Sequence, residues 1–415
     1  MENYIGDWLN LLLRWLHVIT GIAWIGSSFY FVWLDNSLVR PAAQDLKDKG
    51  VDGELWAVHG GGFYNPQKYM VAPKQLPEHL HWFYWESYWT WMSGFALFVV
   101  LYLFNAQTFL IDKNVFAWDS SAAAIVASLV YLVMGWVVYD GICRAFGQRK
   151  NGDLIVGVLV FVYVIAATFI ACHLFAGRAA FLLTGAMLAT AMSANVLMVI
   201  IPGQKKTVAA MKAGQKPDPM HPMRAKQRSV HNTYFTLPVL FAMLSNHYSF
   251  TWSHPQNWLV LILMMFAGAA IRQFFVMRHG YKLGRNGNPL PYALVGVAVI
   301  VGAIVWMRPA PVAAPAANAT VSGAASADKT GASGQNDFKA VQAVLEQRCY
   351  MCHGAAVQMK NLRLDSPDSV KQHAQAIYQQ AVVQKLMPMN NATGITDAER
   401  ALIGKWFEAG APMGP

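Results

Sequence analysis

Apolar and polar stretches alternate along the first three quarters of the chain. The length of each apolar run is near the ~20 residues that a helix needs to cross the hydrocarbon core of a bilayer. A spanning segment must satisfy its backbone hydrogen bonds internally, so each run predicts an α-helix. The pattern therefore predicts an all-α fold in which residues 1–308 form a polytopic membrane bundle of eight transmembrane helices. The predicted spans cover residues 8–34, 82–104, 118–140, 154–176, 178–201, 230–250, 257–277 and 289–307.

The pattern changes abruptly after Arg308. Residues 309–335 consist mainly of Pro, Ala, Ser and Gly without an apolar period, which predicts a disordered tether. In residues 336–415, apolar positions recur at helical spacing between polar loops, which predicts a small soluble α-helical domain. Its last helix is expected to begin at Thr396, because Glu399 follows three residues later, as in a capping box.

The distribution of charge predicts how the bundle lies in the membrane. Only 13% of the residues are charged, whereas a soluble domain carries roughly 25%, so much of the surface must face lipid. One set of alternate loops holds eighteen Lys and Arg, and the opposite loops hold two, Lys113 and Arg178. The positive-inside rule then places both termini in the periplasm of a bacterial inner membrane. The net charge of +10 is thereby explained without a nucleic-acid partner.

The C-terminal domain contains the pattern C-x-x-C-H, formed by Cys349, Cys352 and His353. Two thiols at this spacing can each form a thioether with one haem vinyl group, and the adjacent histidine then coordinates the iron. Met387, which precedes a proline ahead of the last helix, is the favoured second axial ligand, and Met389 is the alternative. The pattern predicts a class I-type cytochrome c domain with one covalent haem c.

The main alternatives for the two cysteines are a zinc half-site and a redox dithiol. A zinc site needs a further pair of Cys or His ligands, and only His373 is at hand in this domain. A thioredoxin-like dithiol belongs to a βαβ unit, which a helical domain lacks. A c-type haem is attached outside the cytoplasm, and the charge distribution independently predicts the same side.

Four ionisable side chains fall in the predicted outer half of the bundle: Arg14, His17, His173 and His247. Ionisable groups inside a membrane are costly and usually functional. Two histidines from different helices could ligate a buried b-type haem, or Arg14 with the histidines could bind a planar anion and move its protons. Each histidine could instead simply bond a neighbouring helix. Arg14 and His17 stand three residues apart, on one helical face.

Another polar group falls in the predicted inner half of the bundle. It includes Asp140 and His231, and also Glu86 and Arg272, which could form an ion pair of purely structural importance.

Two membrane segments carry a resemblance to a known family. They are RWLHVITGIAWIGSSFYFVWLDNSL at residues 14–38 and LPEHLHWFYWESYWTW at residues 76–91. Together with the C-terminal CYMCH motif they resemble the bacterial membrane-bound urate oxidases that are fused to cytochrome c. The resemblance implies an oxidoreductase of purine degradation that converts urate to 5-hydroxyisourate. Electrons would pass to the fused haem and on to the respiratory chain, through a soluble cytochrome c or a terminal oxidase.

The resemblance also suggests roles for the membrane residues. Urate is a planar anion, so Arg14 is expected to anchor it. His17, with His173 or His247, is expected to serve as proton acceptor or as haem ligand. The first span is also similar to membrane proteins that hold haem through a histidine at this place, which makes His17 the preferred ligand. Whether a haem b is present stays open.

Two other functions fit the same sequence features. The first is a non-catalytic conduit that takes electrons from quinol and passes them to the cytochrome. The second is a transporter or sensor with a fused redox domain. The enzyme is favoured over both only through the family resemblance.

Overall fold

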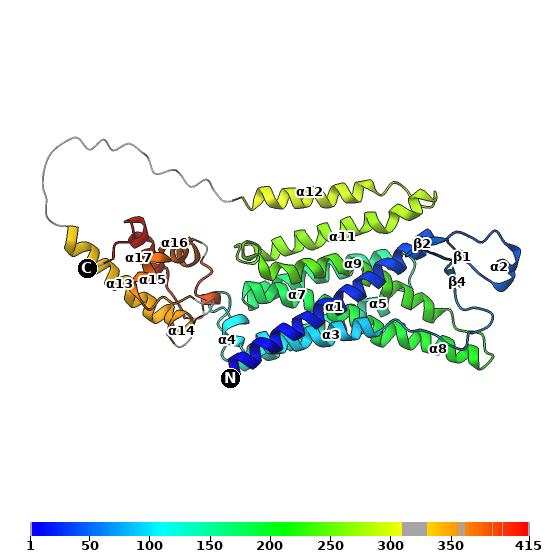
Figure 1. The fold of residues 1–415 in the computed structure, drawn as a ribbon. Coiled ribbons are helices and arrows are strands. Elements are labelled where there is room, and N and C mark those ends of the chain that lie inside the picture. The colour runs from blue at the N-terminus through cyan, green and yellow to red at the C-terminus, as the bar shows by residue number, and fades with distance from the viewer. Residues whose placement is uncertain are drawn as a thin grey trace.

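The computed structural model describes residues 2–308, 330–355, 358, 362–383, 385–391 and 393–413. In this part of the chain, long antiparallel helices form a bundle, and shorter helices form a separate C-terminal domain at one end of it (Figure 1). The long helices are α1 (Glu2–Ser37), α3 (Trp85–Phe98), α5 (Ser121–Phe146), α6 (Gly152–Leu174), α7 (Gly177–Asn195), α9 (Met220–Leu244), α11 (Asn257–Lys282) and α12 (Leu290–Trp306). Single π-helical segments extend two of them: η1 (Val99–Leu103) follows α3, and η2 (Val196–Ile200) joins α7 to α8 (Ile201–Lys212).

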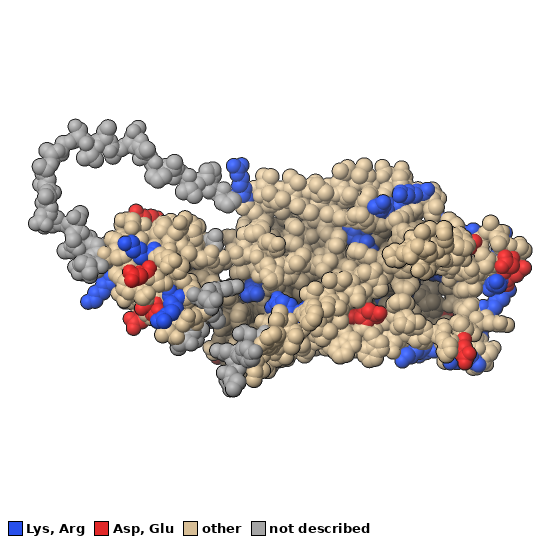
Figure 2. Space-filling view, in the orientation of Figure 1, with Lys and Arg blue, Asp and Glu red and all other residues tan. Residues whose placement is uncertain are grey.

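Each predicted span overlaps one of these helices. Five helical segments are long and apolar enough to cross a membrane, and α12 is apolar but shorter. The five are Trp8–Ser37, Ser121–Phe146, Gly152–Leu174, Gly177–Lys212 and Asn257–Lys282. Many of the outward-facing side chains on these helices are large hydrophobic groups, and the flank of the bundle in Figure 2 carries few charges. These helices are consistent with a membrane protein, and the count of eight spans stays a prediction.

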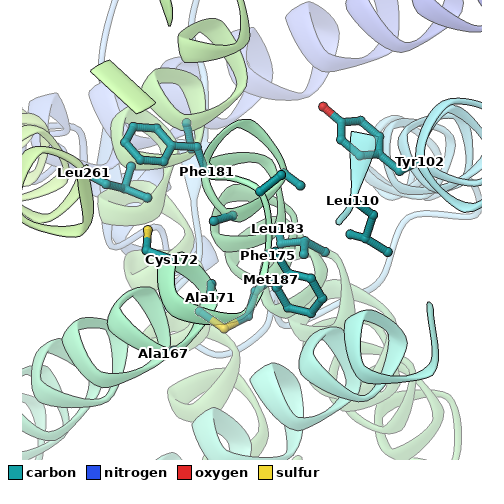
Figure 3. Close-up of a cluster of buried hydrophobic side chains, with 14 of the residues drawn as sticks. Tyr102, Leu110, Ala167, Ala171, Cys172, Phe175, Phe181, Leu183, Met187 and Leu261 are labelled. Atoms are coloured by element: carbon teal, nitrogen blue, oxygen red, sulfur yellow. The ribbon is translucent and has the colours of Figure 1, made fainter. Parts of the chain in front are cut away.

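The core of the bundle lies around α7, where α5, α6 and η1 meet it (Figure 3). Phe181, Leu183 and Met187 of α7 are fully buried there. Small residues allow the helices to approach closely, as is usual between membrane helices. A Cβ added at Gly185, for example, would lie 2.7 Å from the Cβ of Ala242 on α9.

The connections sort to the two ends of the bundle (Figure 1). One end carries the loop after α1, the helix α8 and the turn between α11 and α12. At this end Arg285 Nη2, in the turn between α11 and α12, donates to the carbonyl oxygen of Leu38, just after α1, at 2.6 Å. The other end carries the N-terminus, α4 (Ala106–Phe109) and the C-terminal domain. The loops that the charge count assigned to one side therefore do share one end.

The loop after α1 corrects the all-α prediction. It contains α2 (Gln44–Lys49) and two small antiparallel sheets. Ala57, Val58 and His59 pair with Tyr64, Phe63 and Gly62 around a turn in which Gly60 and Gly61 have positive φ. These strands are only two or three residues long, too short for an alternating pattern to reveal. The strands are β1 (Gly53–Glu54), β2 (Ala57–His59), β3 (Gly62–Tyr64) and β4 (Gln67–Lys68).

The C-terminal domain packs its first helix against its last. Val341 and Leu345 of α13 meet Ile403 and Trp406 of α17 in a buried core. The predicted capping box at Thr396 is confirmed, because both of its reciprocal bonds with Glu399 are present. The elements are α13 (Thr330–Arg348), α14 (Tyr350–His353), α15 (Pro367–Gln372), α16 (Ala374–Ile377), η5 (Tyr378–Val383), η6 (Met389–Asn391) and α17 (Asp397–Glu408).

Most of the predicted tether, residues 309–329, lies outside the described residues. Helix α13 begins at Thr330, six residues before the predicted domain boundary at residue 336. No proline interrupts residues 330–335, so the amphipathic helix can extend backwards into them.

Candidate functional site

His17 is held between α1 and α3. Its Nδ1 lies 3.0 Å from the carbonyl oxygen of Thr90 and 3.2 Å from the Oγ of Ser93. The ring rests against Gly94, where an added Cβ would come within 2.7 Å of the ring Cε1. Because Nδ1 is engaged with α3, proton transfer or coordination at His17 falls to Nε2.

Arg14 lies one turn before His17 on α1, as predicted. Its side chain is exposed, and Nη2 donates to Oδ1 of Asn10 at 3.2 Å. Its charge is within electrostatic range of the His17 imidazole and of the Tyr102 hydroxyl on η1. The structure thus brings Arg14 and His17 together on one side of the bundle, at the level of α3 and η1.

A second polar group at this end was not predicted. The Tyr102 hydroxyl donates to Oδ1 of Asn246 at 3.0 Å, and Nε of Arg178 donates to the same oxygen at 3.1 Å. The Arg178 guanidinium also lies 5.8 Å from the centre of the Phe109 ring. The available signal was that Arg178 is one of only two cations in the outer loops, where it was read as an ordinary loop charge.

The structure does not join His173 or His247 to the Arg14–His17 pair. His173, near the end of α6, is exposed, with Nδ1 2.7 Å from Phe169 O and its ring stacked on Phe169 at 4.0 Å. His247 is exposed in η3 (Ser245–His247), beside Asn246. Among the described residues, no hydrogen bond or ring contact joins either histidine to Arg14 or His17. Their predicted roles stay predictions.

In the inner half of the bundle, two of the predicted residues, Asp140 and His231, belong to a buried network whose other members were not predicted. Arg228 Nη2 pairs with Asp140 at 2.7 Å, and its Nη1 donates to Asn195 Oδ1 at 3.3 Å. Asn195 in turn donates to the Tyr139 hydroxyl at 3.0 Å. The same hydroxyl lies 2.8 Å from His231 Nδ1. Because each member has partners, this network can stabilise the packing of α5, α7 and α9.

A cavity of about 200 Å³ adjoins this network between α6, α9 and α11. Its polar lining comes from His231 and Tyr234 of α9, and the remaining wall is apolar. Tyr234 also donates from its hydroxyl to Gln273 on α11.

Arg272 does not have the partner expected for it. Its guanidinium lies 3.8 Å from the centre of the Phe29 ring on α1, and the described residues include no ion pair between Arg272 and Glu86. The side chain projects from α11 toward α1. The predicted ion pair, which rested on sequence position alone, is therefore not formed.

The C-x-x-C-H motif of the C-terminal domain forms one helical turn. The Cys349 carbonyl accepts bonds from the N–H groups of Cys352 at 3.1 Å and His353 at 2.8 Å. His353 Nδ1 lies 3.4 Å from the carbonyl oxygen of Leu362. Burial, together with the neighbouring Cys352 thiol, raises the pKa of Cys349 to about 11, and both cysteines are half-buried.

The segment with the two candidate methionines is tied to the last helix. Buried Arg400 of α17 donates from Nη1 to Met387 O at 2.8 Å and also to Ala381 O. Met387 and Met389 are both half-buried, so burial does not choose between them.

The C-terminal domain touches the bundle through this same segment. Helical turn η6, which begins at Met389, lies against α4 of the bundle. Burial raises the pKa of Asp112, just after α4, while the Asn114 N–H and the nearby Arg400 charge oppose that rise. The contact brings a methionine-bearing segment to the end of the bundle that holds Tyr102 and Arg178.

The comparison with protein families gives one match. A family model described as "Urate oxidase N-terminal" matches residues 3–308, which is the whole helical bundle. The chain belongs to the urate oxidase N-terminal family. The match indicates a urate-related oxidoreductase. It ends at residue 308 and does not include the C-terminal domain. No curated protein and no solved structure matches the chain.

Proposed function

We propose that the bundle oxidises urate to 5-hydroxyisourate and passes the electrons to a c-type haem in the C-terminal domain. Urate and water yield 5-hydroxyisourate, two protons and two electrons, and the electrons leave one at a time. The family match over residues 3–308 carries this proposal, and the C-x-x-C-H turn supports the electron acceptor. A soluble cytochrome c or a terminal oxidase of the respiratory chain would then accept the electrons.

The C-terminal residues fit a covalent haem. Cys349 and Cys352 stand on one helical turn with His353 directly after them. The Leu362 carbonyl faces His353 Nδ1, and a contact of this kind orients a histidine so that its Nε2 can bind iron. Met387 or Met389 would hold the iron together with His353. When bound, the haem supplies a one-electron carrier.

The reaction also needs a proton acceptor within the bundle. His17 is the favoured candidate, because its ring is fixed by Thr90 and Ser93 while Nε2 is left for chemistry. The same nitrogen could instead bind a haem b, and His173 or His247 would then be candidates for the second ligand. Arg14 is the predicted substrate anchor beside it. If Arg14→Ala leaves urate affinity and turnover unchanged, that role is lost.

A row of aromatic rings leads from the level of His17 to the C-terminal domain. Trp91, Phe95, Phe98, Tyr102 and Phe109 follow one another with ring centres 5.2, 6.4, 5.7 and 6.0 Å apart. The row begins next to Thr90, which contacts His17, and ends on α4, against which η6 lies. Close-packed rings shorten the gaps that an electron must tunnel across, so we propose this row as the electron route.

Anaerobic mixing of the purified protein with urate tests the function. We expect urate to reduce the c-type haem, observed by its absorbance, with 5-hydroxyisourate as product. A pyridine haemochrome spectrum of the same sample counts c-type and b-type haem separately. The Cys349→Ser/Cys352→Ser protein should lose the covalent haem and turnover with the external acceptor. Haem reduction by quinol but not by urate would replace the enzyme with the electron conduit.

A further inference from the structure

Arg272 is a buried cation whose hydrogen-bond donors have no partners. Its exposed fraction is 6%, and its Nε and Nη2 atoms are buried without a hydrogen bond. No carboxylate pairs with it within the part of the chain that the structure describes. The other fully buried arginine of the bundle, Arg228, has Asp140 as its counter-ion.

Phe29 compensates only part of this charge. A cation over a ring face is stabilised by the ring quadrupole, and the Arg272 guanidinium lies 3.8 Å from the Phe29 ring centre. The N–H bonds of a guanidinium, however, lie in its own plane and point outward from its edges. Two of these donor atoms, Nε and Nη2, have no hydrogen-bond partner beside the ring, which is costly inside a membrane.

The two unpartnered donors lie on the same edge of the group. Nε–H and the nearer N–H of Nη2 run parallel, as the two prongs of a fork. Such a fork matches two neighbouring acceptor atoms on a planar anion. The missing partner is therefore an anion that offers two acceptors side by side in one plane.

We propose that Arg272 forms a second, inner binding site for the substrate, a planar organic anion held through Nε and Nη2. The inference rests on the proposed function for the choice of urate as that anion. This site is separate from the Arg14–His17 pair in the outer half of the bundle, because Phe29, which Arg272 faces, follows His17 on α1 by twelve residues, ~18 Å along a helix.

Depth in the bundle argues against a lipid phosphate as the partner. Arg272 precedes Lys282, at the inner end of α11, by ten residues, which is ~15 Å along a helix. The predicted span ends nearer, at residue 277, but Nε and Nη2 of Arg272 are buried among protein side chains, whereas a lipid headgroup lies at the surface of the bundle. Tyr234, within electrostatic range of Arg272, also lines the cavity of about 200 Å³ with His231. Arg272 itself does not line that cavity, so an anion reaches its two donors only when neighbouring side chains move.

Equilibrium binding of radiolabelled urate to the full-length protein in nanodiscs tests this assignment. Arg272→Met should weaken urate binding by about tenfold or more, because two bonds to a charged donor are lost. Arg272→Lys keeps the charge but not the two parallel donors, so its urate affinity should lie between those of the unaltered protein and Arg272→Met. Arg278→Met is the matched control, since Arg278 lies on the same helix beside an aromatic ring, Phe275, and should bind urate like the unaltered protein.

Thermal unfolding gives a second readout that a purely structural arginine would not produce. Without urate, Arg272→Met should melt at the same or a higher temperature, because an unpaired buried charge has been removed. Urate should raise the melting temperature of the unaltered protein and not that of the variant. A lower melting temperature with unchanged urate affinity would overturn the proposal in favour of a structural role.

Two further arms separate the remaining outcomes. The protein is compared in nanodiscs of phosphatidylcholine and of phosphatidylglycerol. If the anionic lipid raises the melting temperature in a way that depends on Arg272, and urate has no effect, the partner is a lipid headgroup and the proposal is overturned. Haem reduction by urate is measured in parallel. Normal haem reduction with unchanged urate affinity in Arg272→Met would overturn the role of Arg272 and leave the proposed function standing. Arg272-dependent urate binding without haem reduction would support the role of Arg272 and overturn the proposed function.

Discussion

Polar side chains in this bundle differ most in whether their hydrogen-bonding groups and charges have partners. Asp140 and Arg228 neutralise each other and are bonded onward to Asn195, so they can hold helices together without a ligand. His17 has one nitrogen held and one left for chemistry. Arg272 lacks partners for two donors. The unsatisfied groups, not the most polar ones, are therefore the candidates for function.

Gly94 is the residue that sets the position of His17. In Gly94→Ala, the new Cβ would come within 2.7 Å of the imidazole, so the ring must move. We expect reduction of the haem by urate to slow by about tenfold or more, because small misplacements of a reacting group are costly. Stopped-flow absorbance measures this rate.

The matched control is Gly21→Ala on α1, where the nearest atom to the new Cβ is Thr90 Cγ2 at 4.0 Å. This variant should reduce the haem at the normal rate. If Gly94→Ala is equally fast, the position of His17 is not important for the reaction.

At the scale of elements, α3 and η1 do more than fill a place in the bundle. Their aromatic side chains recur at helical spacing, so consecutive rings meet along one face. The row from Trp91 to Tyr102 is mostly packed against other helices, and Phe98 and Tyr102 are 4% exposed. The same spacing that builds a core therefore also builds a continuous path of rings.

Phe98→Leu tests the path. Leucine conserves most of the volume but removes the central ring of the row, so we expect slower transfer from urate to the haem, measured in a single turnover. Urate affinity and haem reduction by ascorbate should not change. Phe274→Leu, which removes one ring of a pair on α11, is the control. Equal transfer rates in both variants would exclude this route.

Glu399, in the first turn of the last helix, is expected to make the stability of the C-terminal domain depend on pH. Burial alone would raise the pKa of Glu399, but bonds from the Thr396 N–H at 2.7 Å and from Arg348 at 3.0 Å outweigh it and lower the pKa below the ordinary 4.5. The stabilisation is therefore complete above pH 4.5 and is lost as the pH falls through the lowered value.

Hydrogen exchange of the α17 amides in the full-length protein, corrected for the intrinsic effect of pH, measures this loss. Protection should fall below pH 4.5 in the unaltered protein. Glu399→Gln keeps a capping side chain but does not titrate, so its protection should change less over the same range. A parallel decline in both proteins would assign the pH effect to other groups.

At the scale of the whole molecule, the two domains meet at one end of the bundle. The C-terminal domain touches α4 through η6, and the basic loops lie at the opposite end (Figures 1 and 2). If the basic end is cytoplasmic, the C-terminal domain is periplasmic, where c-type haem is attached.

Cysteine labelling in intact cells tests this orientation. A cysteine in place of Lys113, in the loop after α4, should react with a membrane-impermeant maleimide added outside. A cysteine in place of Lys282, at the far end of α11, should react only after the membrane is opened. Labelling is scored relative to the unaltered chain, whose Cys143 and Cys172 are buried. The reverse pattern would place the C-terminal domain in the cytoplasm.

Short-range features of this protein were predictable from its sequence. The helices, the tight connection between α6 and α7, the turn from Cys349 to His353 and the cap at Thr396 each depend on residues within a few positions of one another. Arg14 and His17 also met because three residues separate them on one helix. Local spacing is enough to determine such contacts.

The composition and order of residues thus determined that the chain is a bundle of membrane helices with basic loops at one end and a C-x-x-C-H domain after it. The tertiary structure alone decided that Tyr102 shares Asn246 with Arg178, that His17 rests on Gly94, and that Arg272 faces Phe29 rather than Glu86. The physical reason is that such meetings depend on how each helix is rotated and where it crosses its neighbours. Packing of the whole bundle sets these quantities, and no single apolar run contains them.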